Sequence, residues 1–163
     1  MKTFGIILIA LIAVLVVIQF FHPSKNISTA KSPNDMAVVH NVPANVRTIL
    51  DKACNDCHSN NTRYPWYNNV QPVAWWLDHH VQEGKRELNF NEFAAYPLRK
   101  QYHKLEEVTE MVEEGEMPMS SYTLIHSDAR LTDQEKETLI NWANSLRSEM
   151  KAKYPADSLV RKR

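Results

Sequence analysis

The feature that most constrains this chain is the pentapeptide Cys54-Asn55-Asp56-Cys57-His58. Its two cysteines are the only ones among 163 residues, and two neighbouring thiols cannot staple distant parts of a secreted domain. The fold must therefore rest on an apolar core, for which an apolar content of 44% is adequate in a single domain. We expect the two thiols and the imidazole to serve local chemistry.

The order C-x-x-C-H is the attachment signature of c-type haem. Two thiols on one turn can add to the two vinyl groups of the porphyrin, and an imidazole directly after them can reach the iron from the same side. The pattern predicts one covalently attached haem c, held by Cys54 and Cys57, with His58 as the proximal iron ligand. A thioredoxin-like pair would need a βαβ setting, and a structural zinc site would need a second ligand pair at finger-like spacing; the sequence offers neither.

Apolar residues recur at helical spacing in four segments after residue 40. Gly84 and Gly115 each end such a segment, where a left-handed cap residue is favoured. Thr132 and Glu135 form a capping box at the start of the last helix, which is expected to end near residues 151–154. No sustained alternating strand pattern occurs, so the predicted fold class is all-α. The four apolar stripes are Val46, Ile49, Leu50 and Ala53; Val73, Trp76, Leu77 and His80; Leu98, Tyr102, Leu105, Val108 and Val112; and Leu139, Trp142, Ala143 and Leu146.

Residues 4–21 form an almost wholly apolar run after Lys2. At helical rise this run nearly crosses a bilayer core of about 30 Å, so the sequence predicts an N-terminal transmembrane helix. A secretory signal segment is the alternative, although no small-x-small cleavage site follows. By the positive-inside tendency, Lys2 stays in the cytoplasm and the rest of the chain lies on the opposite side of the membrane. The predicted location is the bacterial inner membrane, single-pass, with the domain in the periplasm, where covalent haem attachment takes place.

Composition divides the chain into four predicted parts. The anchor or signal segment covers residues 1–22, and a linker rich in Ser, Asn, Pro and Lys covers residues 23–40. The haem-binding domain covers residues 41–154, and a basic tail covers residues 155–163. Nineteen basic and nineteen acidic side chains cancel, so no charge field suited to nucleic acid is expected.

The sixth position of the iron decides between electron transfer and ligand chemistry. Met117 and Met119 flank Pro118 in an irregular stretch after Gly115, and either methionine can face the haem. The structural alternative is that both methionines fill gaps in the core and do not bind the iron. Histidine ligation or an open position is the alternative. The histidine candidates are His79, His80, His103 and His126.

The sequence also resembles the small bacterial haem-binding domain proteins that carry an N-terminal membrane segment. The resemblance covers roughly residues 42–146 and implies a monohaem, cytochrome-c-like helical domain in the periplasm. It favours Met117 over Met119 as distal ligand, because Met117 lies in the family-like tripeptide. The matching segments are Cys54 to His58, Tyr64-Pro65-Trp66-Tyr67, Glu116-Met117-Pro118 and the late helix with Trp142.

Three functions compete. One-electron transfer to a redox protein partner is the leading hypothesis, because a thioether ligand fills the site and raises the potential. A haem sensor or peroxidase-like enzyme is the second, with Arg63, His79 or His126 polarising a bound ligand. The third is a module that stores haem or supports a larger membrane complex, with the tail Arg161-Lys162-Arg163 as a contact.

Two further groups of residues have a structural and a functional interpretation. The tryptophans Trp66, Trp75, Trp76 and Trp142 can pack against a porphyrin or fill the core. A run of glutamates can steer a basic partner, although a solvated helix face explains it better. These residues are Glu106, Glu107, Glu110, Glu113, Glu114 and Glu116.

Overall fold

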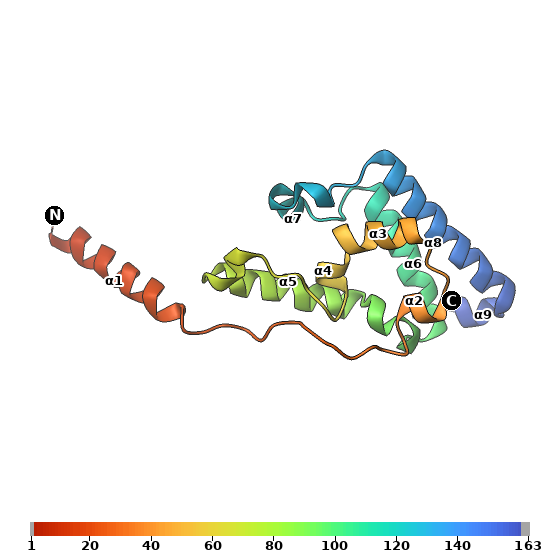
Figure 1. Ribbon diagram of the computed structural model, residues 1–163, viewed down its shortest axis with the longest axis horizontal. Coiled ribbons are helices and arrows are strands. Elements are labelled where there is room, and N and C mark those ends of the chain that lie inside the picture. Colours follow the sequence, from red (N-terminus) through yellow and green to blue (C-terminus); the bar gives the residue numbers. More distant parts are fainter. Residues whose placement is uncertain (1, 161–163) are drawn as a thin grey trace.

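The computed structural model describes residues 2–160, and its regular secondary structure in that range is helical, apart from one isolated bridge between Ile27 and Asn61 (Figure 1). The predicted all-α class is confirmed for the described residues. The predicted tail contact at residues 161–163 lies outside them. The helices are α1 (Lys2–Ile18), α2 (Met36–Val39), α3 (Ala44–Ala53), α4 (Asn55–His58), η1 (Trp66–Asn69), α5 (Val73–Glu87), η2 (Phe90–Ala95), α6 (Leu98–Glu113), α7 (Ser120–Ile125), η3 (Ser127–Ala129), α8 (Asp133–Lys153) and α9 (Ala156–Leu159).

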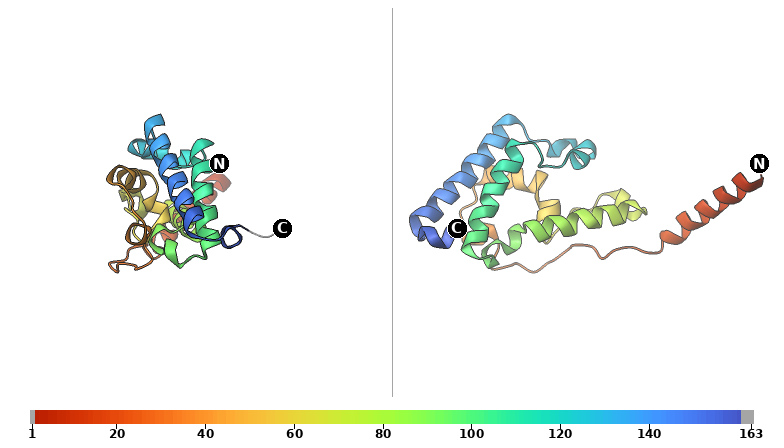
Figure 2. Two further views of the ribbon diagram at one scale, coloured as in Figure 1. Left: turned by 90° about the vertical axis from the view of Figure 1, so that its right-hand side faces the viewer. Right: turned by 180° about the vertical axis from the view of Figure 1, so that it is seen from behind.

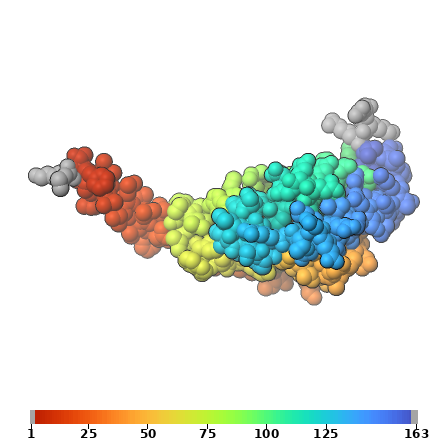
Figure 3. Space-filling model, turned by 90° about the horizontal axis from the view of Figure 1, so that it is seen from above, coloured from red at the N-terminus to blue at the C-terminus, as the bar shows by residue number. Residues whose placement is uncertain are grey.

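Helix α1 projects from the rest of the molecule, and its large apolar side chains are exposed (Figure 3). It ends at Ile18, after 17 residues, and the amide of Gln19 then bonds to the backbone of Gln71, donating to its carbonyl at 3.2 Å and accepting from its N–H at 2.9 Å. Among residues 2–160, no helix combines the length and apolar character needed to cross a bilayer. The structure therefore does not support the transmembrane helix predicted at residues 1–22.

The core lies between α6 and α8, which pack along each other, with α3 against α8 and α9 against α6 (Figure 1). The stripes predicted for α3 and α8 are buried throughout, and the α6 stripe is buried except for its partly buried members Leu98 and Val108. The short helix η2 adds Phe90 and Phe93, the latter fully buried. Trp142 is buried and donates its indole N–H to the carbonyl of Asn41 at 3.3 Å.

The helix ends test three predictions. The capping box of Thr132 and Glu135 is present, and α8 ends at Lys153, as expected. Gly115 follows α6 with φ +76°, which confirms its left-handed cap position. The prediction for Gly84 is wrong, because α5 continues to Glu87. A Cβ at Gly84 would stand 2.6 Å from the carbonyl oxygen of Cys57, so this glycine lets α5 lie directly against the cysteine motif.

The segment 19–35 runs in extended form along the outside of α5 instead of hanging free (Figure 2, right). Asn26 is almost fully buried and anchors this segment. Its side-chain amide donates to the carbonyl of Ser59 at 2.9 Å, and its oxygen accepts from Lys85 at 2.6 Å. Its backbone N–H donates to the hydroxyl of Tyr64 at 2.7 Å. Most of the predicted linker is therefore attached to the domain.

The half-buried His40 packs edge-on against Phe93, with ring centroids 5.9 Å apart. Burial lowers the pKa of His40, Glu149 opposes this shift and Lys153 adds to it. In the unfolded chain, histidine has a pKa of about 6.5, so below that pH the unfolded state binds more protons than the folded state. We expect the free energy of unfolding to fall as the pH drops from 7 to 5.

Urea denaturation of the haem-loaded chain at pH 7 and pH 5 measures this pH dependence. The variant His40→Gln removes the titrating group, so its free energy of unfolding should fall less between the two pH values than that of the wild type. An equal fall in both proteins would contradict the assignment to His40.

Candidate functional site

The cysteine motif lies at the bend between α3 and α4, where Cys54 ends one helix and begins the next. Both thiols are free. Burial raises the pKa of Cys54 to about 12 and that of Cys57 to about 11, so both stay protonated near neutral pH. Thiolates attack disulfides and bind zinc, so this environment does not favour either alternative use of the pair.

The imidazole of His58 is oriented by the loop after α5. Its Nδ1 lies 2.9 Å from the carbonyl oxygen of Leu88, and Phe90 packs edge-on against the ring at 6.2 Å. Burial lowers the pKa of His58 and so favours the neutral ring, while the hydrogen bond to the carbonyl of Leu88 opposes this shift. A neutral ring that donates Nδ1–H to this carbonyl keeps the Nε2 lone pair free for a metal ion.

Two neighbouring, mainly apolar cavities meet at the motif. One, of about 230 Å³, lies between α4, α5 and residues 117–119; the other, of about 470 Å³, lies between α3, the end of α5 and α6. Cys54, His58 and Met117 line both cavities. Binding sites for cofactors usually occupy about 300–1,000 Å³ with apolar walls, so the pair of cavities suits one large, flat, apolar group.

The structure brings both predicted methionines to the site. Met117 is half-buried, and its backbone N–H donates to the carbonyl of Met111 at 3.0 Å, which ties it to the end of α6. Met119 lines the smaller cavity and a third cavity, which Cys57 also lines. Met117 therefore shares more of its surroundings with His58 than Met119 does.

Three of the histidine candidates are engaged elsewhere, but His80 is not. His80 lines the smaller cavity, and its Nδ1 lies 2.8 Å from the carbonyl oxygen of Trp76. This contact leaves Nε2 free, as the contact with Leu88 does in His58. His103 lines the larger cavity and faces Glu107 at 3.0 Å. His79 faces Glu83 at 3.5 Å, and the Nε2 of His126 lies 2.7 Å from the hydroxyl of Tyr67.

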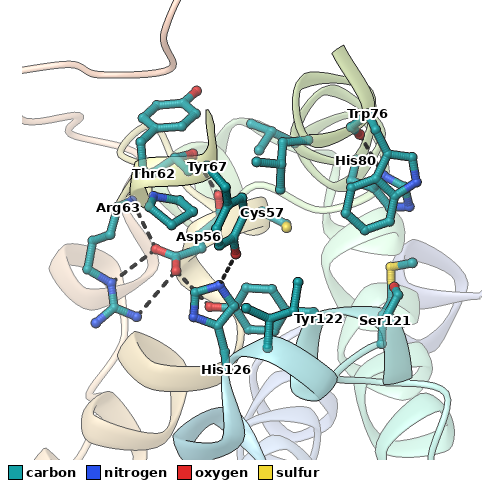
Figure 4. Close-up of a pocket in the computed structure, with 16 residues that line it drawn as sticks. Asp56, Cys57, Thr62, Arg63, Tyr67, Trp76, His80, Ser121, Tyr122 and His126 are labelled. Atoms are coloured by element: carbon teal, nitrogen blue, oxygen red, sulfur yellow. Dashed lines mark hydrogen bonds and ion pairs between the residues drawn. The ribbon is translucent and has the colours of Figure 1, made fainter. Parts of the chain in front are cut away.

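A polar cluster beside Cys57 was not expected from the sequence (Figure 4). Asp56, buried inside the motif, accepts hydrogen bonds from Nε of Arg63 at 3.1 Å and from the hydroxyl of Tyr122 at 2.7 Å. Arg63, predicted as a residue that polarises a bound ligand, is thus committed to Asp56. The only signal in the sequence was an acidic residue between the two cysteines.

The remaining expectations have mixed outcomes. Trp142 is a core residue, but Trp66 is 79% exposed, and Trp75 and Trp76 are more than 40% exposed, so core packing does not explain these three. Glu106 pairs with Arg147, and Glu107 pairs with Lys104. The other glutamates of the run are exposed, as expected of a solvated face. They are Glu110, Glu113, Glu114 and Glu116.

A helical domain that presents C-x-x-C-H and an oriented histidine to adjoining apolar cavities defines a haem-binding protein. The family model described as haem-binding domain matches residues 13–145, which is most of the chain. The chain belongs to this family and binds haem, and the free pair Cys54 and Cys57 is consistent with its C-x-x-C-H motif. No curated protein and no solved structure matches the chain.

Proposed function

We propose that this protein carries single electrons through one covalently attached haem c in the bacterial periplasm. The observation that carries the proposal is the shared cavity wall, where Met117 stands together with Cys54 and His58. The S–H of each cysteine would add across one vinyl group, which forms two thioether bonds without loss of atoms. The haem iron, when bound, supplies a ferrous–ferric couple.

The residues of the chain would hold the iron in both oxidation states. His58 binds through Nε2, and the carbonyl of Leu88 keeps the imidazole in the required orientation. Met117 would supply a thioether ligand, which would exclude water from the iron and raise the reduction potential. A site that changes little between oxidation states suits a carrier, which must pass its electron to a redox protein partner.

Sensor or peroxidase-like chemistry is the less favoured candidate. It needs a free polar group to polarise a bound ligand, whereas Arg63 bonds Asp56, His79 faces Glu83 and His126 bonds Tyr67. Covalent haem attachment in bacteria takes place outside the cytoplasm, which supports the periplasmic location.

The absorption spectrum of the ferric, haem-loaded chain tests the proposal. Wild type should show the weak sulfur-to-iron band at about 695 nm that marks methionine ligation, and Met117→Ala should lack it, because alanine offers no thioether. Met119→Ala is the matched control and should keep the band. Haem should also stay with the chain in acidified acetone, as thioether bonds require.

A high-spin wild-type spectrum without this band would overturn the carrier proposal and favour the sensor or peroxidase-like enzyme. Loss of the band in Met119→Ala alone would move the ligand from Met117 to Met119.

A further inference from the structure

The segment that carries the two methionines is weakly held by apolar contacts. It leads into α7, and none of the described side chains of that helix is buried. Figure 3 shows α7 in cyan on the molecular surface. Met117 is tied to α6 through one backbone hydrogen bond, to Met111. Other contacts must therefore hold this segment against the haem site.

Two tyrosine hydroxyls supply those contacts (Figure 4). Tyr122, on α7, donates to a carboxylate oxygen of Asp56 at 2.7 Å, and the ring of Tyr122 stacks on His126 at 4.4 Å. His126 in turn bonds the hydroxyl of Tyr67 at 2.7 Å. Both bonds join α7 and the residue after it to the segment that contains and follows the cysteine motif.

The bond from Tyr122 should be the stronger of the two. Its acceptor is a buried carboxylate, and hydrogen bonds to charged groups are roughly twice as strong as those between neutral groups. Arg63 donates to the same carboxylate from its backbone N–H at 3.0 Å and from Nε at 3.1 Å, which fixes the acceptor. Burial raises the pKa of Tyr122, with Asp56 adding to the effect, so the hydroxyl remains a donor at neutral pH.

We propose that Tyr122 is a positioning residue for the distal side of the haem. Through Asp56, it fastens the segment 117–126 to the motif that carries the proximal ligand. The distal segment and the proximal ligand are thereby held at a fixed distance from each other. This inference rests on the proposed haem attachment, but it holds whether or not Met117 is the sixth ligand, because it concerns the position of the whole segment.

The variant Tyr122→Phe tests this proposal in the haem-loaded full chain, because it removes the hydroxyl and keeps the ring. Two readouts are needed: hydrogen exchange of the amides in residues 115–126, and the rate at which imidazole binds the ferric haem. Losing a hydrogen bond to a charged group should raise both by roughly 10- to 100-fold. Tyr64→Phe is the matched control, since it removes a bond of the same 2.7 Å length that does not involve α7, and it should leave both rates unchanged.

The outcomes separate this inference from the proposed function. Faster exchange and faster imidazole binding in Tyr122→Phe alone support the positioning role, with or without the methionine band in wild type. Rates equal to wild type, or equal increases in Tyr64→Phe, would overturn it. A faster exchange without faster imidazole binding would reduce Tyr122 to a purely structural role and would also overturn it. Absence of the methionine band in wild type would count against the carrier proposal only.

Discussion

Replacing Gly84 with alanine should destabilise the haem-loaded protein by about 2 kcal/mol or more, the usual cost of overpacking. In the interior of a helix the same change normally stabilises by about 1 kcal/mol, so the sign is reversed here. The added Cβ would stand 2.6 Å from the carbonyl oxygen and 3.0 Å from the Cβ of Cys57. The obstructing atoms are backbone atoms and a Cβ, which cannot rotate away.

The change at Gly84 should also lower the yield of covalently bound haem, because α5 would be pushed away from the motif that receives it. Urea denaturation measures the stability, and the haem absorbance per chain measures the yield. Gln82→Ala, at an exposed position of the same helix, is the control and should change the free energy of unfolding by less than about 0.5 kcal/mol. A stabilised Gly84→Ala protein would show that α5 does not lie against Cys57 as described.

The variant Asn26→Ala should have the second large effect, a loss of about 2–4 kcal/mol in the free energy of unfolding. Alanine leaves the carbonyl of Ser59, the hydroxyl of Thr62 and the ammonium of Lys85 without the partner they have in the buried Asn26 side chain. A buried group that loses its partner costs more than the bond itself contributed. Thermal denaturation of the haem-loaded chain measures this loss.

Ser28→Ala is the control for this position, because Ser28 lies in the same segment and its hydroxyl only accepts from the N–H of Ala30 at 3.2 Å. Its free energy of unfolding should change by less than about 0.5 kcal/mol. An Asn26 variant as stable as the Ser28 variant would mean that the buried hydrogen bonds of the Asn26 side chain contribute nothing to the stability of the fold.

The sequence was sufficient to predict what depends on local pattern. The apolar stripes of α3, α6 and α8, the capping box at Thr132 and the left-handed Gly115 all follow from spacing or backbone preference within a few residues. The motif was recognisable for the same reason, since its chemistry lies within five consecutive residues. Haem binding could therefore be predicted before any long-range contact was known.

The errors and omissions concern contacts between distant residues. A glycine near the end of a helical pattern fits a cap and a close approach equally well, and only the packing of α5 against Cys57 distinguishes them at Gly84. Asn26 looked like part of a polar linker, because its partners lie more than thirty positions away. The pair of Asp56 and Tyr122, 66 residues apart, leaves no periodic signal at all.

The attachment of residues 19–35 has a kinetic consequence. A group on a flexible tether samples separations that spread as the square root of the tether length. Here hydrogen bonds along the segment, from Gln19 to Asn26, keep the distance between α1 and the cysteine motif fixed. Because electron tunnelling slows steeply with distance, the carrier proposed above would pass electrons to an acceptor attached to α1 with a single exponential rather than a spread of rates.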